Sequence, residues 1–311
     1  FLIMSKELVF GHKNPDTDAI SCAIEYAYLA NKLGDEVEAV ALGKTNNETN
    51  FVLNRFNVKA PRVITKAKPE VDSVVLVDHN EAIQSVDDLA DVTVTSVIDH
   101  HKINFSSAQP LFYRAEPIGC CSTIIYKMYL ENNVEIPSNI AGLMLSSIIS
   151  DTLLLKSPTT TDDERNAVPA LAKIAGIDDY EAYGIEMLKA GSDVNDRSAT
   201  DILEGDAKSF DMGGKTVRIG QVNAVDLNDV FKRQAELETT MTDLMADKSY
   251  DLFLLLATNV LTSDSELLAL GEGTDVVEQA FGTKFCKHRM NLPGVVSRKK
   301  QVVPPLTKAF D

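Results

Sequence analysis

Two adjacent histidines, His100 and His101, follow Asp99 at the end of an apolar run in the segment VIDHHKINF. The run is typical of a buried strand, and side chains that are neighbours on an extended strand point to opposite faces. We therefore expect the two imidazoles to have different roles rather than one shared role in packing. Imidazoles beside a carboxylate are suited to binding a metal ion.

Two other segments place the same residue types directly after apolar runs. GHKNPDTD follows the apolar run ELVF, and VDHNE overlaps the end of the run SVVLVD. Each segment alone has a simpler explanation, because Asp and Asn after a strand often form turns and Asp18 could cap a following helix. Three such places together favour a functional cluster, and its candidates are His12, Asp16, Asp18, Asp78, His100 and His101.

The first half of the chain alternates short runs rich in Val and Ile with segments of helix length. This alternation predicts a mostly parallel sheet flanked by helices. Ligands bind beyond the carboxyl ends of the strands in such sheets, which is where the three segments fall. We therefore expect the candidate residues to share one edge of one sheet.

Carboxylates and imidazoles without thiolates suit Mn²⁺ or Mg²⁺ better than a structural zinc site. Asp151, in SSIISDT, ends an apolar run, where a carboxylate is costly unless it is paired, metal-bound or turned to solvent. The resulting ligand set is too large for one ion. Two ions about 3.5–4 Å apart, bridged by a carboxylate, would use it fully and could catalyse phosphoryl transfer.

A cationic run, Arg298 to Lys300, lies in VVSRKKQVV near the C-terminus. Such a run usually forms a solvated surface. In a chain with an acidic metal cluster, however, it could hold the oxygens of a phosphate substrate.

The 311 residues, 44% of them hydrophobic, are enough for two domains. With 30 Lys and Arg against 46 Asp and Glu, the net charge of −16 argues against a broad nucleic-acid surface. No apolar stretch approaches the roughly 18 residues of a membrane span, and FLIMSKELVF lacks the pattern of a secretory signal. We expect a cytoplasmic protein without a membrane partner. Its four cysteines are expected to be reduced and in or near the core.

The second half of the chain predicts a different architecture. The segments DAKSFDMGGKTVRIGQVNAV and YDLFLLLATNVLTSDSELLALG read as hairpins, and DLNDVFKRQAELETTMTDLMAD between them reads as a helix. The polar segment KAGSDVND is the predicted hinge. We thus expect a catalytic domain at 1–188, a linker at 189–196 and a smaller mixed α+β substrate-binding domain at 197–311, with the active site in the cleft between the domains.

These motifs resemble those of the DHH phosphoesterase superfamily and, within it, the family II, manganese-dependent inorganic pyrophosphatases. GHKNPDTD, VDHNE, IDHH, SDT and SRKKQ occur in that family's order across essentially the whole chain. The last motif is specific to the pyrophosphatase C-terminal domain. The glycine-rich GGGH motif of nuclease-like members is absent.

The resemblance implies hydrolysis of inorganic pyrophosphate by a water that two metal ions activate. It assigns one Mn²⁺ to His12, Asp16 and Asp78, and a second to Asp18, Asp78, His100 and Asp151. His101, Lys208, Arg298 and Lys299 are implied as contacts of the substrate phosphates. It also implies that the substrate arrives with Mg²⁺ and that the chain forms a homodimer.

Other interpretations stay open at the level of the sequence. Another DHH-type phosphoesterase would act on polyphosphate, short oligonucleotides or cyclic dinucleotides. A binding module without catalysis would hold metal or nucleotide but release no phosphate. Co²⁺ or Mg²⁺ could replace Mn²⁺, and the roles of Asp99, His79 and Lys300 are undetermined.

Overall fold

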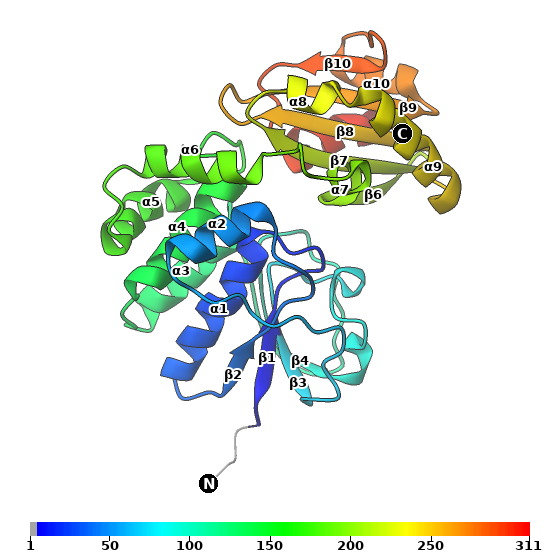
Figure 1. Cartoon of the computed structure of the whole chain (residues 1–311). Coiled ribbons are helices and arrows are strands. Elements are labelled where there is room, and N and C mark those ends of the chain that lie inside the picture. Colours follow the sequence, from blue (N-terminus) through cyan, green and yellow to red (C-terminus); the bar gives the residue numbers. More distant parts are fainter. Residues whose placement is uncertain (1–4) are drawn as a thin grey trace. The chain divides into compact units, whose positions relative to one another are not determined.

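The computed structural model describes residues 5–311, which form two compact units, one up to Met187 and one from Leu188 to Asp311 (Figure 1). Helix α6, Tyr180–Gly191, includes the first residues of the segment predicted as a linker, so that segment is non-helical only from 192 to 196. None of the helices in the described part of the chain is long and apolar enough to span a bilayer.

The first unit contains a five-stranded sheet in the order β2-β1-β3-β4-β5, and every strand pair in it is parallel. The predicted parallel sheet is therefore confirmed. Its three central strands are those that precede the three polar segments of the sequence, so their carboxyl ends lie side by side. The strands are β1 (Glu7–Phe10), β2 (Val37–Ala39), β3 (Ser73–Val77), β4 (Thr93–Asp99) and β5 (Phe112–Ala115).

Different structures cover the two faces of this sheet. Helices α1 and α3 contact β1 and β4 on one face, and α4 packs against α1. On the other face, Leu8 and Phe10 of β1 pack against apolar residues from 64–71 and 86–92, and the short 3₁₀ helix η2 is the one helix in these two ranges. The helices of this unit are α1 (Thr17–Lys32), α2 (Asn47–Arg55), α3 (Cys121–Glu131), α4 (Ser138–Thr152), α5 (Asp162–Ala175), α6, η1 (Ala82–Gln84) and η2 (Leu89–Asp91).

Glycine at position 11 brings the end of β1 against the first turn of α1. A Cβ atom at Gly11 would lie 2.6 Å from the carbonyl oxygen of Ala19, which no other residue could accommodate without a backbone shift. The loop that carries the first polar segment is thus short and tightly packed, and it presents His12 beside the start of α1.

The second unit has a five-stranded mixed sheet in the order β10-β9-β8-β7-β6. The two predicted hairpins are confirmed as the antiparallel pairs β6–β7 and β8–β9, and Gly213 and Gly214 form the first turn with positive φ angles of 57° and 76°. The strands β7 and β8, however, are parallel. The strands are β6 (Ala207–Met212), β7 (Lys215–Ala224), β8 (Leu252–Asn259), β9 (Asp264–Gly271) and β10 (Arg289–Leu292).

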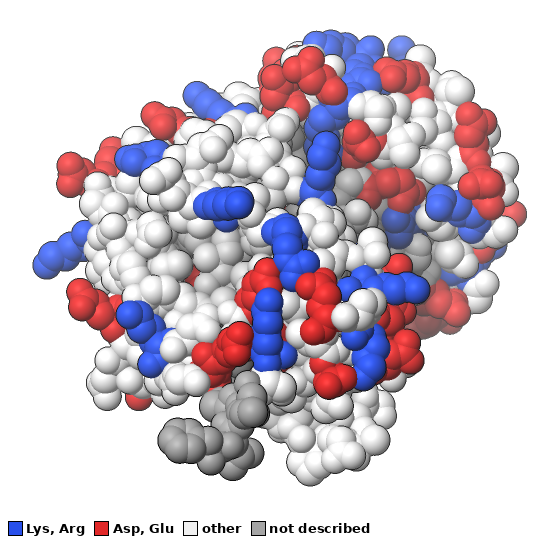
Figure 2. Space-filling view, turned by 60° about the horizontal axis from the view of Figure 1, so that its bottom comes forward, with Lys and Arg blue, Asp and Glu red and all other residues white. Residues whose placement is uncertain are grey.

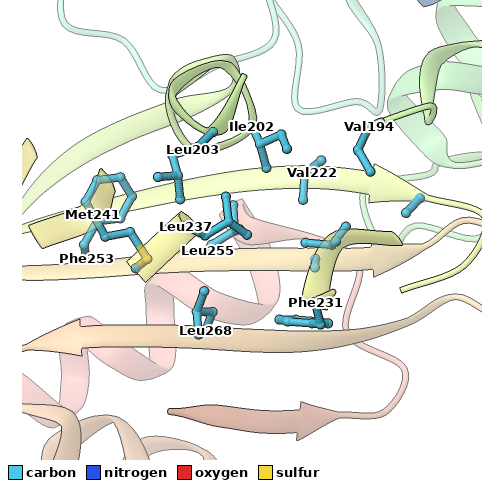
Figure 3. Packing of buried hydrophobic residues seen from close by; sticks show 14 residues of the cluster. Val194, Ile202, Leu203, Val222, Phe231, Leu237, Met241, Phe253, Leu255 and Leu268 are labelled. Carbon is cyan, nitrogen blue, oxygen red and sulfur yellow. The ribbon is translucent and has the colours of Figure 1, made fainter. Parts of the chain in front are cut away.

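Helices cover both faces of the second sheet. On one face α7 (Ala199–Glu204), α8 (Asn228–Phe231) and α9 (Gln234–Lys248) bury a core in which Leu203, Leu237 and Met241 meet Leu255 of β8 (Figure 3). On the other face, Val277 of α10 (Thr274–Phe281) and Leu306 of α11 (Val303–Phe310) are part of a second core.

Two details of the sequence-based prediction were wrong. The helix predicted between the hairpins is interrupted at Lys232 and Arg233, which separate α8 from α9. Cys286 is exposed rather than near the core, whereas the other three cysteines are buried. All four are free thiols.

Candidate metal centre

Asp78 lies directly after β3, the strand between β1 and β4, and is only 2% exposed. Its φ angle of 57° is in the left-handed region, which is unusual for a residue with a side chain. Its backbone N–H donates to the carbonyl oxygen of Ile98 at the end of β4, at 2.9 Å. In this conformation the carboxylate of Asp78 lies at the carboxyl ends of the central strands.

The two oxygens of the Asp78 carboxylate face different imidazoles. Oδ2 lies 3.5 Å from Nε2 of His12, and Oδ1 lies 3.2 Å from Nε2 of His100. Oδ1 is buried and has no hydrogen-bond partner among the described residues. A buried carboxylate oxygen without a partner is costly, and a cation on each side of the carboxylate would satisfy it.

The first ligand group contains His12, Asp16 and Asp78, whose ligand atoms lie within 4.8 Å of one another. His12 places Nδ1 2.7 Å from the carbonyl oxygen of Lys13, to which it donates, so its Nε2 lone pair is free to bind a metal. Asp16 is the N-cap of α1, where its Oδ1 accepts from the N–H of Ala19 at 2.9 Å. Its Oδ2 lies 3.4 Å from Nε2 of His12.

Asp18 does not cap the helix in which it lies. Instead, its fully buried carboxylate accepts from the N–H groups of Cys121 at 2.8 Å and Ser122 at 3.1 Å, at the N-terminus of α3. The dipole of α3 favours a negative charge there. Ligand atoms of Asp18, Cys120 and Asp151 lie within 4.8 Å of one another. This group brings two carboxylates together, and a cation would offset their repulsion.

Neighbouring charges shift the pKa values of this cluster in opposite directions. Burial disfavours charge on Asp78, but the imidazoles of His100 and His12 outweigh it and hold the pKa of Asp78 well below its ordinary value. Burial disfavours charge on His100 as well, yet Asp78 raises the pKa of His100 to about 9. Burial and then the adjacent Asp18 raise the pKa of Asp151 well above its ordinary value. Without a cation the cluster therefore retains protons, and cation binding is coupled to their release.

The adjacent histidines do not point to opposite faces, which corrects our expectation. Strand β4 ends at Asp99, so the alternation of an extended strand does not continue through the pair. Both imidazoles face Asp78: Nε2 of His100 and Nδ1 of His101 lie 3.2 and 3.8 Å from its Oδ1. His100 donates from Nδ1 to the carbonyl oxygen of Ile118 at 2.9 Å, which directs its Nε2 toward the cluster.

Asp99, whose role the sequence left open, holds His101. Its fully buried carboxylate accepts from Nδ1 of His101 at 2.7 Å and from the N–H of His100 at 2.8 Å. Asn80 donates to the other oxygen at 2.7 Å. Because Nδ1 of His101 donates to Asp99, Nε2 is left for another partner.

His79 is buried, and its ring nitrogens lie 2.8 Å from the carbonyl oxygen of Val77 and 2.9 Å from the hydroxyl of Ser85. Burial lowers the pKa of His79 to about 4, so the ring is neutral near pH 7. It stabilises the loop after β3 and does not belong to the ligand groups.

Glu48 of α2 is a carboxylate that the sequence did not single out. Its Oε1 accepts from the hydroxyls of Thr17 at 2.5 Å and Ser150 at 2.6 Å. These residues are direct neighbours of Asp16, Asp18 and Asp151. Glu48 thus ties the start of α1 to the end of α4, and only the packing of three helices reveals it.

The chain turns sharply after Asp151. Leu153, Leu154 and Leu155 have φ angles of 47°, 57° and 64°, a run of left-handed residues that costs roughly 1–2 kcal/mol for each. The hydroxyl of Thr152 accepts from the N–H of Leu155 at 3.0 Å and stabilises the turn. Helix α4 therefore ends immediately after Asp151, whose side chain is 19% exposed at the end of the helix.

The second unit contains the cationic candidates, of which Arg298 contacts strand β7 and the residue before β6. Arg298 begins a π-helical turn, η3 (Arg298–Val302), and its guanidinium donates to the carbonyl oxygen of Ile219 and to Oδ1 of Asp206 at 2.7 Å. Ile219 is the register partner of Lys208 in β6. Lys299 follows in the same turn. Lys300 contributes its backbone N–H to the hydroxyl of Ser297.

Comparisons with known proteins cover nearly the whole chain. Residues 6–148 match the DHH family, N-terminal domain, and residues 185–309 match the DHHA2 domain. A relative from Lactiplantibacillus plantarum, named "Probable manganese-dependent inorganic pyrophosphatase", is 63% identical over 309 residues, which are 99% of this chain and 100% of the relative. A relative from Lactobacillus acidophilus with the same name is 58% identical over 311 residues, with 99% and 100% covered.

Solved structures show the same similarity. A crystal structure from Methanococcus jannaschii, titled "putative family II inorganic pyrophosphatase", has a TM-score of 0.86 and 39% identity, and the match covers 98% of this chain and 99% of that chain. An exopolyphosphatase-related protein from Bacteroides fragilis has a TM-score of 0.52 at 12% identity, covering 98% and 92%, and shares the fold.

Asp78→Ala tests the shared carboxylate. We expect the variant to lose Mn²⁺ affinity by more than about 100-fold, because even the partners of metal ligands contribute 10–100-fold. Titration followed by electron paramagnetic resonance of free Mn²⁺ measures this, and thermal unfolding monitors the fold. Asp87→Ala is the control, since Asp87 is a solvent-exposed partner of Lys13. Normal binding of two Mn²⁺ ions by Asp78→Ala would contradict the assignment.

Proposed function

The chain belongs to the DHH family and, within it, to the manganese-dependent inorganic pyrophosphatases, and we propose that it hydrolyses pyrophosphate at the metal centre around Asp78. The motif resemblance is thereby confirmed, and the chain is a hydrolase that releases two phosphates from pyrophosphate. The observation that carries the proposed centre is the Asp78 carboxylate, whose two oxygens face the imidazoles of His12 and His100.

Six side chains are proposed to hold two Mn²⁺ ions. The first ion would take His12 and Asp16, the second Asp18, His100 and Asp151, and both would share Asp78. The buried oxygen of Asp78 that has no hydrogen bond among the described residues, the close carboxylates and the orientation of both Nε2 atoms support this division. Oxygen and nitrogen donors of this kind fit Mn²⁺, with Co²⁺ or Mg²⁺ as alternatives.

When bound, the two ions supply the Lewis acidity that activates a water and neutralises phosphate oxygens. The protein's own residues bind and orient the substrate. His101 is proposed to contact a phosphate through Nε2, because Asp99 accepts from its Nδ1. Lys208, Arg298 and Lys299 are proposed to neutralise the remaining phosphate charge, and Mg²⁺ to accompany the substrate.

The proposed domains are 1–188 for metal binding and catalysis, 189–196 as a linker and 197–311 for substrate binding. The polar composition of residues 192–196 and their lack of helix support a hinge. Replacing 189–196 with a rigid helix tests this role. If the segment is a hinge, turnover should fall markedly while thermal stability changes little.

A cytoplasmic homodimer without nucleic acid as a partner is proposed. The free thiols fit a reducing compartment. Strand β5 is a sheet edge at which Phe112 is 50% exposed, and such an edge can pair with a second copy. The face drawn in Figure 2 mixes acidic and basic side chains without a continuous basic band. Sedimentation velocity measures the mass of the assembly.

A phosphate-release assay tests the proposed function. We expect hydrolysis of pyrophosphate with Mn²⁺, loss of activity after chelation and recovery when Mn²⁺ is returned. Triphosphate and short oligonucleotides are the contrasting substrates, assayed with both Mn²⁺ and Mg²⁺. Faster release from either of them than from pyrophosphate would contradict the assignment.

Arg298→Ala tests the cationic residues. Removal of one donor that stabilises developing charge lowers turnover by about 10²–10³-fold, so we expect kcat/KM for pyrophosphate to fall by that factor with Mn²⁺ content unchanged. Lys215→Ala is the control, because Lys215 pairs with Glu272 and has no proposed contact with substrate. Loss of Mn²⁺ from the Arg298 variant would show that the residue was assigned to the wrong role.

A further inference from the structure

Glu25 is a fully buried carboxyl group that the proposed reaction does not use. It lies in α1 two turns after Asp18, on the same face of the helix. Its Oε2 has no hydrogen-bond partner, and no ion pair within residues 5–311 includes it. In the described part of the chain, the one side-chain partner of Glu25 is the hydroxyl of Ser122, whose Oγ lies 3.0 Å from Oε1.

The hydroxyl of Ser122 links Glu25 to Asp18. Its Oγ lies 2.8 Å from Oδ1 of Asp18 and 3.0 Å from Oε1 of Glu25. A hydroxyl has one proton and can donate it to only one of these two oxygens. The other contact requires a proton on the partner, since two acceptors cannot form a hydrogen bond.

Burial raises the pKa of both carboxyl groups, but their hydrogen-bond partners differ and favour Glu25 as the group that carries that proton. Asp18 accepts from the backbone N–H groups of Cys121 and Ser122 at the N-terminus of α3, which stabilise its anion. Glu25 has neither such a donor nor a cation. Burial, and then the charge of Asp18, raise the pKa of Glu25 well above its ordinary value.

We propose that Glu25 is held as a neutral carboxylic acid and is a positioning residue for the Asp18 ligand. Its O–H donates to Ser122, and the hydroxyl of Ser122 then donates to Asp18. The proton of this acid remains in place during the reaction. The consequence for metal binding rests on the proposed role of Asp18, whereas the protonation of Glu25 does not.

This chain of hydrogen bonds restrains one oxygen of Asp18. Oδ1 receives the N–H and the hydroxyl of Ser122, and also the thiol of Cys22 at 3.1 Å. The carboxylate cannot rotate without losing these bonds. Glu25 thereby keeps the proton of Ser122 directed at Asp18 from inside the core.

Three variants of the full chain test this proposal. Glu25→Gln keeps a donor of the same size, and Glu25→Met removes the donor but keeps the volume. Tyr129→Phe is the control. The buried hydroxyl of Tyr129 donates to the backbone oxygen of Glu25 at 2.6 Å, but it is not part of the series of hydrogen bonds from Glu25 through Ser122 to Asp18. Infrared spectroscopy of protein with ¹³C-labelled glutamate reports the neutral acid, and electron paramagnetic resonance reports Mn²⁺ binding.

We expect a carboxylic acid C=O band in the wild-type protein, from mildly acidic to mildly basic pH, that is absent in Glu25→Gln. Mn²⁺ affinity should fall about tenfold in Glu25→Met, the lower end of the effect of residues that orient ligands. It should change less than about twofold in Glu25→Gln and Tyr129→Phe.

Absence of the band would overturn the proposal, and so would equal losses of affinity in Glu25→Met and Tyr129→Phe. If Glu25→Met does not fold, the proposal is still tested by the carboxylic acid band of the wild-type protein and by the Mn²⁺ affinity of Glu25→Gln, which is expected to be normal. The band does not depend on metal. A wild-type protein that shows the band but binds no Mn²⁺ would therefore refute the proposed function and the effect of Glu25 on metal binding. It would not refute the protonation of Glu25.

Discussion

The crowding of carboxylates around Asp78 is the constraint on which the rest of the first unit depends. Asp78 is buried, directs its oxygens to two imidazoles and leaves Oδ1 without a hydrogen bond. Four aspartates this close are stable together only with protons or cations between them. Burial and the neighbouring aspartates raise the pKa of Asp151, whereas the imidazoles of His100 and His12 outweigh burial and lower the pKa of Asp78. The proposed pair of divalent cations would remove this repulsion and supply the chemistry of the cluster.

The fold stabilises these crowded carboxylates because N–H groups at helix N-termini donate to two of them. Asp16 accepts from the first turn of α1, and Asp18 accepts from the first turn of α3, although it lies in α1. Backbone N–H groups stabilise negative charge without a competing lysine or arginine. The parallel strands bring the other residues of the cluster together. Strands β1, β3 and β4 end side by side, and His12, Asp78 and the histidine pair lie just beyond their ends.

A second layer of hydrogen bonds fixes the orientation of each imidazole. His12 and His100 donate from Nδ1 to backbone oxygens, and His101 donates from Nδ1 to Asp99. In each ring Nε2 is the nitrogen proposed to bind a metal or the substrate. The proposed acid at Glu25 extends this layer into the core. The same logic applies in the second unit, where Asp206 accepts from Arg298 and orients its guanidinium.

The sequence by itself determined the parallel sheet, the two hairpins of the second unit and five of the six ligand candidates at three strand ends, since these follow from local periodicity and from residues next to a strand. It could not determine contacts between distant residues. Asp18 meets Ser122 across 104 positions, and Glu48 meets Ser150 across 102. The direction of His100 and His101 was mispredicted because the alternation stops where β4 ends. Only the tertiary structure decided which aspartate caps which helix and what Asp99 holds, because packing between elements sets these distances and local sequence does not.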